Sequence, residues 1–242
     1  MAKQVLKRLG LYYGPLALAS QVNQASLEVS GPEVDVSTFD TAGYAEAICG
    51  LLKASVKFDG FFEAVPDEEA FSQLAKSEWP ATLVKPAGAS VAVGDVAYFV
   101  LASNFSHVFG GQVGGVARLS LSLTGAGALL RGAVADVQTA ATATGDGAGH
   151  ELGAVAADER LYYAVHVVGA DGSSPTLDLV VESDADDAWL SPTSRVTPGQ
   201  FTGTGSAYGS IAGPITDTWF RVARTVGGAG ASFHYAVALA IR

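Results

Sequence analysis

Apolar and polar residues alternate along most of the chain, with the two-residue period of strands that bury one face. Residues 25–30 (ASLEVS), 54–62 (ASVKFDGFF) and 118–125 (RLSLSLTG) show this alternation clearly. Residues 160–169 and 176–183 show it too, and the sequence between them, ADGSSP, is typical of a turn. These runs predict a mainly β protein, and the last two predict an antiparallel pair of strands.

A second hairpin is predicted near the end of the sequence. Residues 218–226 (TWFRVARTV) and 232–241 (SFHYAVALAI) alternate in the same way, and the glycine-rich segment GGAGA joins them. Glycine suits the positive backbone angles of tight hairpin turns. We therefore expect the two runs to pair with each other.

One helix is well indicated, over residues 67–76 within the sequence VPDEEAFSQLAKSEW. Acidic residues at its start and Lys76 near its end complement the helix dipole. A weaker helix candidate lies at 44–52. The apolar stripe that the first helix is expected to bury consists of Phe71, Leu74 and Ala75.

The pattern changes after residue 132. Residues 133–158 are rich in Ala, Gly and Thr and carry no strong core pattern, which is typical of a connecting segment. The sequence therefore predicts a first domain at 1–132 with strands and one helix, a linker at 133–149, and a C-terminal β-sandwich at 150–242.

Charge narrows the possible functions. The 242 residues carry a formal net charge of −10, which argues against a protein that binds nucleic acid through Lys and Arg. Only 16% of the residues are charged, below the roughly 25% usual in soluble domains. We expect such a surface to be partly covered by other chains. The longest uncharged run, 96–117, contains four glycines and several polar residues, so no membrane insertion is expected.

Candidate catalytic and redox chemistry is scarce. The single cysteine, Cys49, excludes an intrachain disulfide, and its apolar neighbours predict a small core residue. No HExxH motif, G-x-S-x-G elbow or phosphate-binding loop occurs, so we expect no enzyme and no cofactor. The histidines lack metal-ligand spacing and are expected to be hydrogen-bonded or solvent-facing strand residues. They are His107, His150, His166 and His234.

Two weak ligand sites remain open. Asp184, Asp186 and Asp187 could offer oxygen ligands to calcium, but the loop glycine and distal glutamate of an EF-hand are missing. A solvated acidic turn is the favoured interpretation. Aromatic residues in the C-terminal part could form a sugar-stacking platform, although strand aromatics more often belong to a core or an interface. They are Trp189, Trp219, Tyr162, Tyr163 and Tyr235.

Residues 22–63 resemble the signature region of major tail proteins, the tail tube subunits of long, non-contractile phage tails. A strand ends in EVDVSTF where that family has a Thr-Thr-Phe-like step, an extended loop follows, and an acidic helix comes after DGFF. The loop is more apolar than in many members of the family. The C-terminal part lies outside the family's core domain and looks like the extra sandwich that some tube proteins display. Matching positions in the loop and after it are Gly43, Glu46, Gly50 and Leu51.

The resemblance implies a tube domain built as a β-sandwich or barrel with one flanking helix, plus an outer C-terminal β-sandwich. It implies rings, usually of six subunits, that stack into a tube around a tape-measure protein and conduct DNA during ejection. Tail terminator and baseplate proteins would be the partners at the tube ends. DNA would pass through the lumen without specific binding, and the protein would be a virion component assembled in the host cytoplasm.

The resemblance also suggests roles for individual residues. The loop at 38–52 is expected to contact neighbouring copies or rings, and acids on wet strand faces are expected to line the lumen. The interface residues are Phe39, Tyr44, Glu46, Ile48 and Leu51. The lumen acids are Glu28, Asp35 and Asp59. Two other functions stay open: a tube subunit of a contractile tail or secretion system, and a carbohydrate-binding surface module.

Overall fold

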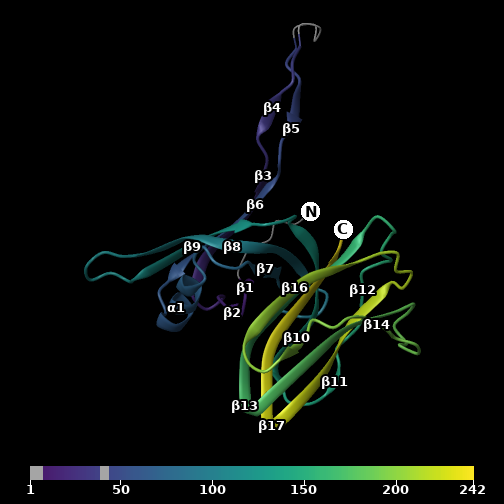
Figure 1. The fold of residues 1–242 in the computed structure, drawn as a ribbon. Coiled ribbons are helices and arrows are strands. Elements are labelled where there is room, and N and C mark those ends of the chain that lie inside the picture. Colours follow the sequence, from purple (N-terminus) through teal and green to yellow (C-terminus); the bar gives the residue numbers. More distant parts are fainter. Residues whose placement is uncertain (1–7, 39–43) are drawn as a thin grey trace. The chain divides into compact units, whose positions relative to one another are not determined.

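The computed structural model describes residues 8–38 and 44–242. With 61% of the residues in strands and 4% in helix, it confirms a mainly β protein with a β-sandwich and one helix. The chain divides into two compact units, which are described separately below (Figure 1). The sandwich unit comprises residues 1–21, 79–101 and 130–242, and the arm unit comprises residues 22–78 and 102–129.

These units differ from the predicted division at residues 132 and 150. The segment predicted as a linker forms strands of the sandwich unit instead. Within it, β10 (Leu130–Ala141) pairs with β8 on one side and with β17 on the other. Small residues in this segment allow close packing between neighbouring strands, so their abundance did not indicate a flexible connection.

Two long strands organise the sandwich unit. They are β13 (Arg160–Asp184) and β17 (Trp219–Ile241), which pair antiparallel from Leu161 opposite Ile241 to Asp184 opposite Trp219. Register shifts interrupt the pairing between Val167 and Thr176. Figure 1 shows both strands turning together near their middles.

The two hairpins predicted in this region are therefore wrong. Residues 160–169 and 176–183 are the two halves of β13, and residues 218–226 and 232–241 correspond to the two halves of β17. The glycine-rich segments lie at the bend, where Gly172 and Gly228 adopt positive φ angles of 114° and 101°. Glycine serves here to turn a continuous strand, which in sequence looks the same as a hairpin turn.

The bend creates the main core. Leu161 and Val165 from the first half of β13 belong to the same buried cluster as Leu177 and Val181 from the second half. Phe220 and Phe233 add the corresponding contributions from the two halves of β17. Because both halves face one another, the strand pair supplies both layers of a sandwich.

A second core lies on the opposite face of the layer that the first half of β13 forms with the second half of β17. Ala164, Ala236 and Ala238 form a buried cluster with Tyr12 and Phe99. The small alanine side chains let the N-terminal strands of this unit pack closely over β13 and β17. This arrangement explains why the segments around Tyr12 and Phe99, distant in sequence from β13 and β17, belong to the sandwich unit.

His166 joins this second core. It is fully buried, stacks on Tyr12 at a ring-centroid distance of 5.3 Å, and contacts Thr82 and Gly14 through its two ring nitrogens at 2.7 Å each. The Gly14 carbonyl oxygen only accepts, so Nδ1 carries the proton and Nε2 accepts from the Thr82 hydroxyl. Burial lowers the pKa of His166 to about 4. The expected hydrogen-bonded strand histidine is found, although in the core.

Most of the remaining strands of the sandwich unit pair with β13 or β17. β16 pairs with the first half of β13, β14 and β15 with its second half, and β11 and β12 with the first half of β17. The bounds are β1 (Gly10–Tyr13), β2 (Leu16–Ala17), β7 (Trp79–Lys85), β11 (Gly145–Asp146), β12 (His150–Glu151), β14 (Thr193–Val196), β15 (Gln200–Phe201) and β16 (Gly205–Ala212). The strand β8 (Val96–Gly110) is shared between the units, and its residues up to Leu101 belong to the sandwich unit.

The arm unit contains a four-stranded antiparallel sheet in the order β3-β6-β9-β8. One face is apolar, with Val56, Phe58 and Leu121 buried. The expected strands at 25–30, 54–62 and 118–125 are confirmed. The strand bounds are β3 (Val22–Ser30), β4 (Glu33–Asp35), β5 (Ala47–Cys49), β6 (Lys53–Phe61) and β9 (Arg118–Gly125).

The helix α1 (Ala64–Ser72) attaches to strand β8 of this sheet. Asn104 donates from Nδ2 to the Ala70 carbonyl oxygen at 3.1 Å, and His107 contacts Asp67 at 2.7 Å. The predicted buried stripe is wrong, since Ala70 is buried whereas Phe71 is 58% exposed. In the described parts of the chain, no helix is long and apolar enough to cross a membrane.

Substitution of Gly132 by alanine is expected to destabilise the sandwich unit. A Cβ atom there would collide with the carbonyl oxygen of Leu239 and lie 2.8 Å from the Cα of Ala240. Because neither backbone atom can move aside without breaking strand pairing, we expect a loss of about 3 kcal/mol. Urea unfolding measures it, with Gly88→Ala as the matched control because its added Cβ meets nothing within 4 Å. Equal stability of both variants would contradict the packing described here.

His166 is expected to make stability fall in mild acid. Its folded pKa of about 4 lies below the ordinary value of 6.5, so the unfolded chain takes up the proton first as the pH drops. Stability from this group is complete above pH 6.5 and falls by about 3 kcal/mol between pH 6.5 and 4. Urea unfolding of the native protein and of His166→Asn across this range isolates the effect. Parallel pH profiles of the two proteins would count against it.

Candidate assembly interface

A two-stranded ribbon in the arm unit exposes several large apolar side chains. We call residues 28–53 the arm; the structure describes residues 28–38 and 44–53 of it. β3 and β6 lead into β4 and β5, and Figure 1 shows this ribbon extending well beyond the four-stranded sheet. The predicted loop at 38–52 thus belongs to the far end of a hairpin.

Backbone pairing defines the arm as a β ribbon. Val34 lies opposite Ile48, and Glu33 lies opposite Cys49. The Val36 N–H donates to the Glu46 carbonyl oxygen at 2.9 Å. The weak helix candidate at 44–52 is therefore wrong, because these residues continue a strand ladder in place of forming local helical bonds.

Two glycines allow the ribbon to stay narrow at its base. A Cβ at Gly31 would lie 2.8 Å from the Sγ of Cys49, and one at Gly50 would lie 2.8 Å from the Cγ of Pro32. The Gly50 N–H also donates to the Pro32 carbonyl oxygen at 2.8 Å. Both glycines therefore permit a close crossing between β3–β4 and β5–β6.

The arm leaves its apolar side chains in solvent. Tyr44 is 80% exposed, Ile48 57% and Leu51 91%. Cys49 is exposed as well, so its predicted place in a core is wrong. Of the predicted interface residues, Phe39 lies outside the described residues, and Glu46 is exposed on the same ribbon. A single chain gains nothing from such exposure, which is typical of surfaces that other chains cover.

The arm is also strongly acidic. No Lys or Arg occurs between Arg8 and Lys53, whereas five acids lie in that interval. Hydrogen bonds from the side chain and backbone N–H of Ser37 hold the pKa of the Asp35 carboxyl below its usual value. Asp35 therefore stays ionised, and the arm presents apolar and negatively charged groups together.

Two of the predicted lumen acids share one face of the four-stranded sheet. Glu28 lies opposite Ser55 and Gln24 opposite Asp59 in the β3–β6 register, and directly opposite residues point to the same side. Lys57, two residues from Asp59, is on this face too. The third predicted acid, Asp35, lies on the arm instead. The other polar members of the face are Ser26, Arg118, Ser120, Ser122 and Thr124.

A second exposed apolar surface was not predicted. We call residues 105–118, where β8 turns into β9, the short hairpin. Phe105, Val108 and Phe109 are between 56% and 62% exposed, and Val113 at the turn is fully exposed. In sequence, all of this stretch except Arg118 belongs to the uncharged run 96–117. Consecutive apolar residues such as Val108 and Phe109 point to opposite faces of a strand, and this pattern could have indicated that one of the two is exposed.

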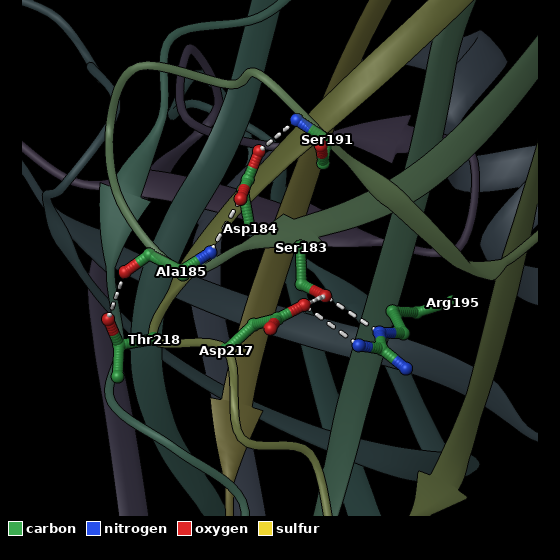
Figure 2. Close-up of polar contacts among 7 residues, drawn as sticks. All are labelled: Ser183, Asp184, Ala185, Ser191, Arg195, Asp217 and Thr218. Atoms are coloured by element: carbon green, nitrogen blue, oxygen red, sulfur yellow. Dashed lines mark hydrogen bonds and ion pairs between the residues drawn. The ribbon is translucent and has the colours of Figure 1, made fainter.

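The calcium candidates do not form a ligand cluster. Figure 2 shows the carboxylate of Asp184 accepting the backbone N–H groups of Ala185 and Ser191, at 2.7 and 3.0 Å. Asp186 accepts the N–H of Ala188 at 3.0 Å. Nowhere in the described chain do three or more acidic, His or Cys side chains gather as a metal site.

Next to this turn, a polar group links three elements of the sandwich unit. Ser183 donates to Asp217 at 2.7 Å, and Arg195 contacts both of them (Figure 2). Hydrogen bonds from Ser183 and Arg195 lower the pKa of Asp217. These bonds leave the Asp217 carboxylate engaged within the fold and give the region a structural role.

The aromatic residues considered for sugar stacking do not form a platform. Tyr235 is completely buried and donates its hydroxyl to Asp136 at 2.6 Å. The Arg221 guanidinium covers the ring of Trp189 at 4.5 Å from its centroid. Tyr162 and Tyr163 are consecutive residues of β13 and point to opposite faces of the sheet.

No protein-family model and no curated protein matches the chain. Among solved structures, a chain from the virion of a native gene transfer agent particle is 21% identical, with a TM-score of 0.41 over 52% of this chain and 97% of that one. A chain from the tail of an empty gene transfer agent particle with C6 symmetry is 19% identical, with a TM-score of 0.38 over 45% and 80%.

The Dit protein of phage SPP1, described as a hub of the adsorption apparatus, aligns along almost the full length of both chains. Coverage is 98% of this chain and 100% of that one, with 9% identity and a TM-score of 0.35. At such low TM-scores and identities, neither a shared fold nor a shared function follows from these likenesses.

Calcium is expected to leave the stability of the protein unchanged. The carboxylates of Asp184 and Asp186 already accept backbone N–H groups, so calcium would gain little by binding at this turn and would not favour the folded state there. Thermal unfolding with millimolar calcium and with a chelator should give the same midpoint. A rise in midpoint that disappears in Asp184→Asn would show that the turn does bind the ion.

Proposed function

We propose that this protein is the tail tube subunit of a phage with a long, non-contractile tail. The observation that carries the proposal is the arm, a β ribbon whose described apolar side chains Tyr44, Ile48 and Leu51 are largely exposed. The resemblance of residues 22–63 to the signature region of tail tube proteins supports it. In this proposal the apolar side chains of the arm are buried only when other copies of the chain cover them, so assembly adds to the stability of the protein.

The four-stranded sheet of the arm unit suits the wall of a tube. Its outer strands in that unit are β3 and β8, and β3 pairs with β6 alone among the described strands. Unpaired strand edges are natural sites for joining further strands. A ring, with six copies as the family usually has, would close through repeated head-to-tail contacts between such subunits.

The polar face of this sheet suits a DNA-conducting lumen. It carries many hydroxyl groups, and Lys57 and Arg118 are balanced there by Glu28 and Asp59. Without an excess of positive charge, the face offers little counterion-release energy to DNA phosphates. We propose that this face lines the lumen and that DNA slides past it.

The remaining assignments follow from the same proposal. A tape-measure protein would occupy the lumen during assembly, and tail terminator and baseplate proteins would contact the tube ends. The chain would act in the virion, after assembly in the host cytoplasm, as a structural protein without catalytic activity. We propose that the sandwich unit serves as decoration on the outside of the tube.

Electron microscopy of the purified protein tests the proposal directly. Negatively stained samples should show rings or filaments with a central hole. A protein that remains a monomer at high concentration, and that is absent from phage tails, would refute the tube function.

The double substitution Tyr44→Asp and Leu51→Asp is expected to abolish assembly while leaving the monomer folded. Burial of each side chain contributes about 2 kcal/mol, so the concentration needed for assembly should rise by more than about 100-fold. Sedimentation measures the assembled fraction, and circular dichroism reports the fold. Leu190→Asp is the matched control, because Leu190 is equally apolar and 86% exposed but lies in the sandwich unit. Normal tubes from the double variant would contradict the role of the arm.

A further inference from the structure

We propose that the short hairpin of one copy is the docking surface for the arm of another copy. This inference rests on the proposed tube function and specifies which surface receives the arm. Both surfaces belong to the arm unit, and both leave large apolar side chains exposed. At the base of the short hairpin Phe109 packs against Phe62, with ring centroids 4.9 Å apart, whereas Val113 at the turn is fully exposed. Charge, geometry and stoichiometry favour pairing the arm with this hairpin.

Charge distinguishes the short hairpin from the rest of this acidic chain. Between Asp95 and Asp136 the sequence contains no Asp or Glu, and its only charged residues are Arg118 and Arg131. Arg118 lies at the base of the short hairpin, is exposed, and has no ion-pair partner among the described residues. The arm has the opposite character, with acids and no base from residue 28 to residue 52.

Geometry favours contact between copies over contact within one copy. Figure 1 shows the arm and the turn between β8 and β9 leaving the four-stranded sheet in different directions. In this structure the arm therefore stays apart from the short hairpin of its own chain. Helix α1 also exposes apolar side chains, but Asp67, Glu68 and Glu69 would repel the acidic arm. Asp67 contacts His107 near the base of the short hairpin, so we place the docking contact at the turn around Val113.

Stoichiometry favours a second copy as the occupant. Each chain carries one arm and one short hairpin, so every donor surface has one acceptor surface in an assembly of identical chains. Such a contact joins two different patches and can repeat from copy to copy. Apolar residues such as Ile48 and Val113 would form its centre, and Arg118 with the arm acids would surround them, as in typical interfaces.

Cross-linking tests the contact, because Cys49 is the only cysteine of the chain and lies exposed on the arm. The variant Val113→Cys adds one cysteine to the short hairpin. In assembled tubes, a short bismaleimide should join Cys49 of one copy to position 113 of the next and give a ladder of covalent multimers on denaturing gels. The native protein, with one cysteine per chain, can give dimers at most.

Two controls define the result. Val113→Cys combined with Cys49→Ser should lose the ladder, and Thr202→Cys, on the exposed surface of the sandwich unit, should not produce one. Val116→Cys is a second acceptor position in case the first disturbs assembly. Tubes that form normally without any ladder from either position would overturn the docking contact and leave the tube function intact. Absence of tubes from the native protein would instead refute the tube function.

Charge reversal provides an independent measurement. Arg118→Glu should raise the concentration needed for assembly by about tenfold, since it places like charges across the contact. Adding Glu33→Lys and Glu46→Lys to the same chain should restore assembly. Arg131→Glu makes the same change in net charge within the sandwich unit and should have little effect. Equal effects of the two arginine variants, or failure of the rescue, would argue against the contact.

Discussion

The continuous pairing of β13 with β17 is the constraint on which the sandwich unit depends. Because both strands bend at the same level, their hydrogen bonds persist into both layers, and one strand pair supplies the two facing sheets. Of the other strands of the unit, β10, β11, β12, β14, β15 and β16 pair directly with β13 or β17, and β8, β7, β1 and β2 follow in that order beyond β10. The conformational freedom of Gly172 and Gly228 makes the shared bend possible.

Local patterns predicted individual strands well and long-range relations poorly. Alternation located β3, β6 and β9 because each has one wet face and one face that is buried, or in β3 half-buried, within a single sheet. The same alternation could not show that residues 160–183 form one bent strand, since a corner and a hairpin turn use similar residues. Domain limits failed for a related reason: each unit combines segments that are distant in sequence.

The sequence located the exposed apolar segment that we propose as an interface, but it did not predict the conformation of that segment. An apolar excursion between two strands located the arm, and Tyr44, Ile48 and Leu51 are indeed exposed there. Its spacing resembled a helix because a ribbon exposed on both sides has no buried face to enforce strict alternation. For the same reason the apolar neighbours of Cys49 led to the wrong prediction of a core residue. The exposed surface of the short hairpin was not predicted at all.

The contact of His166 with Gly14 joins positions 152 residues apart. During synthesis the N-terminal strands of the sandwich unit must therefore wait for β13 and β17 to leave the ribosome, whereas the arm unit needs no residue beyond 129. The arm, with its exposed apolar side chains, is thus present in a nascent chain well before the sandwich unit is complete. A host cell that makes this protein in quantity faces a timing problem, in which early self-association competes with folding of the later half.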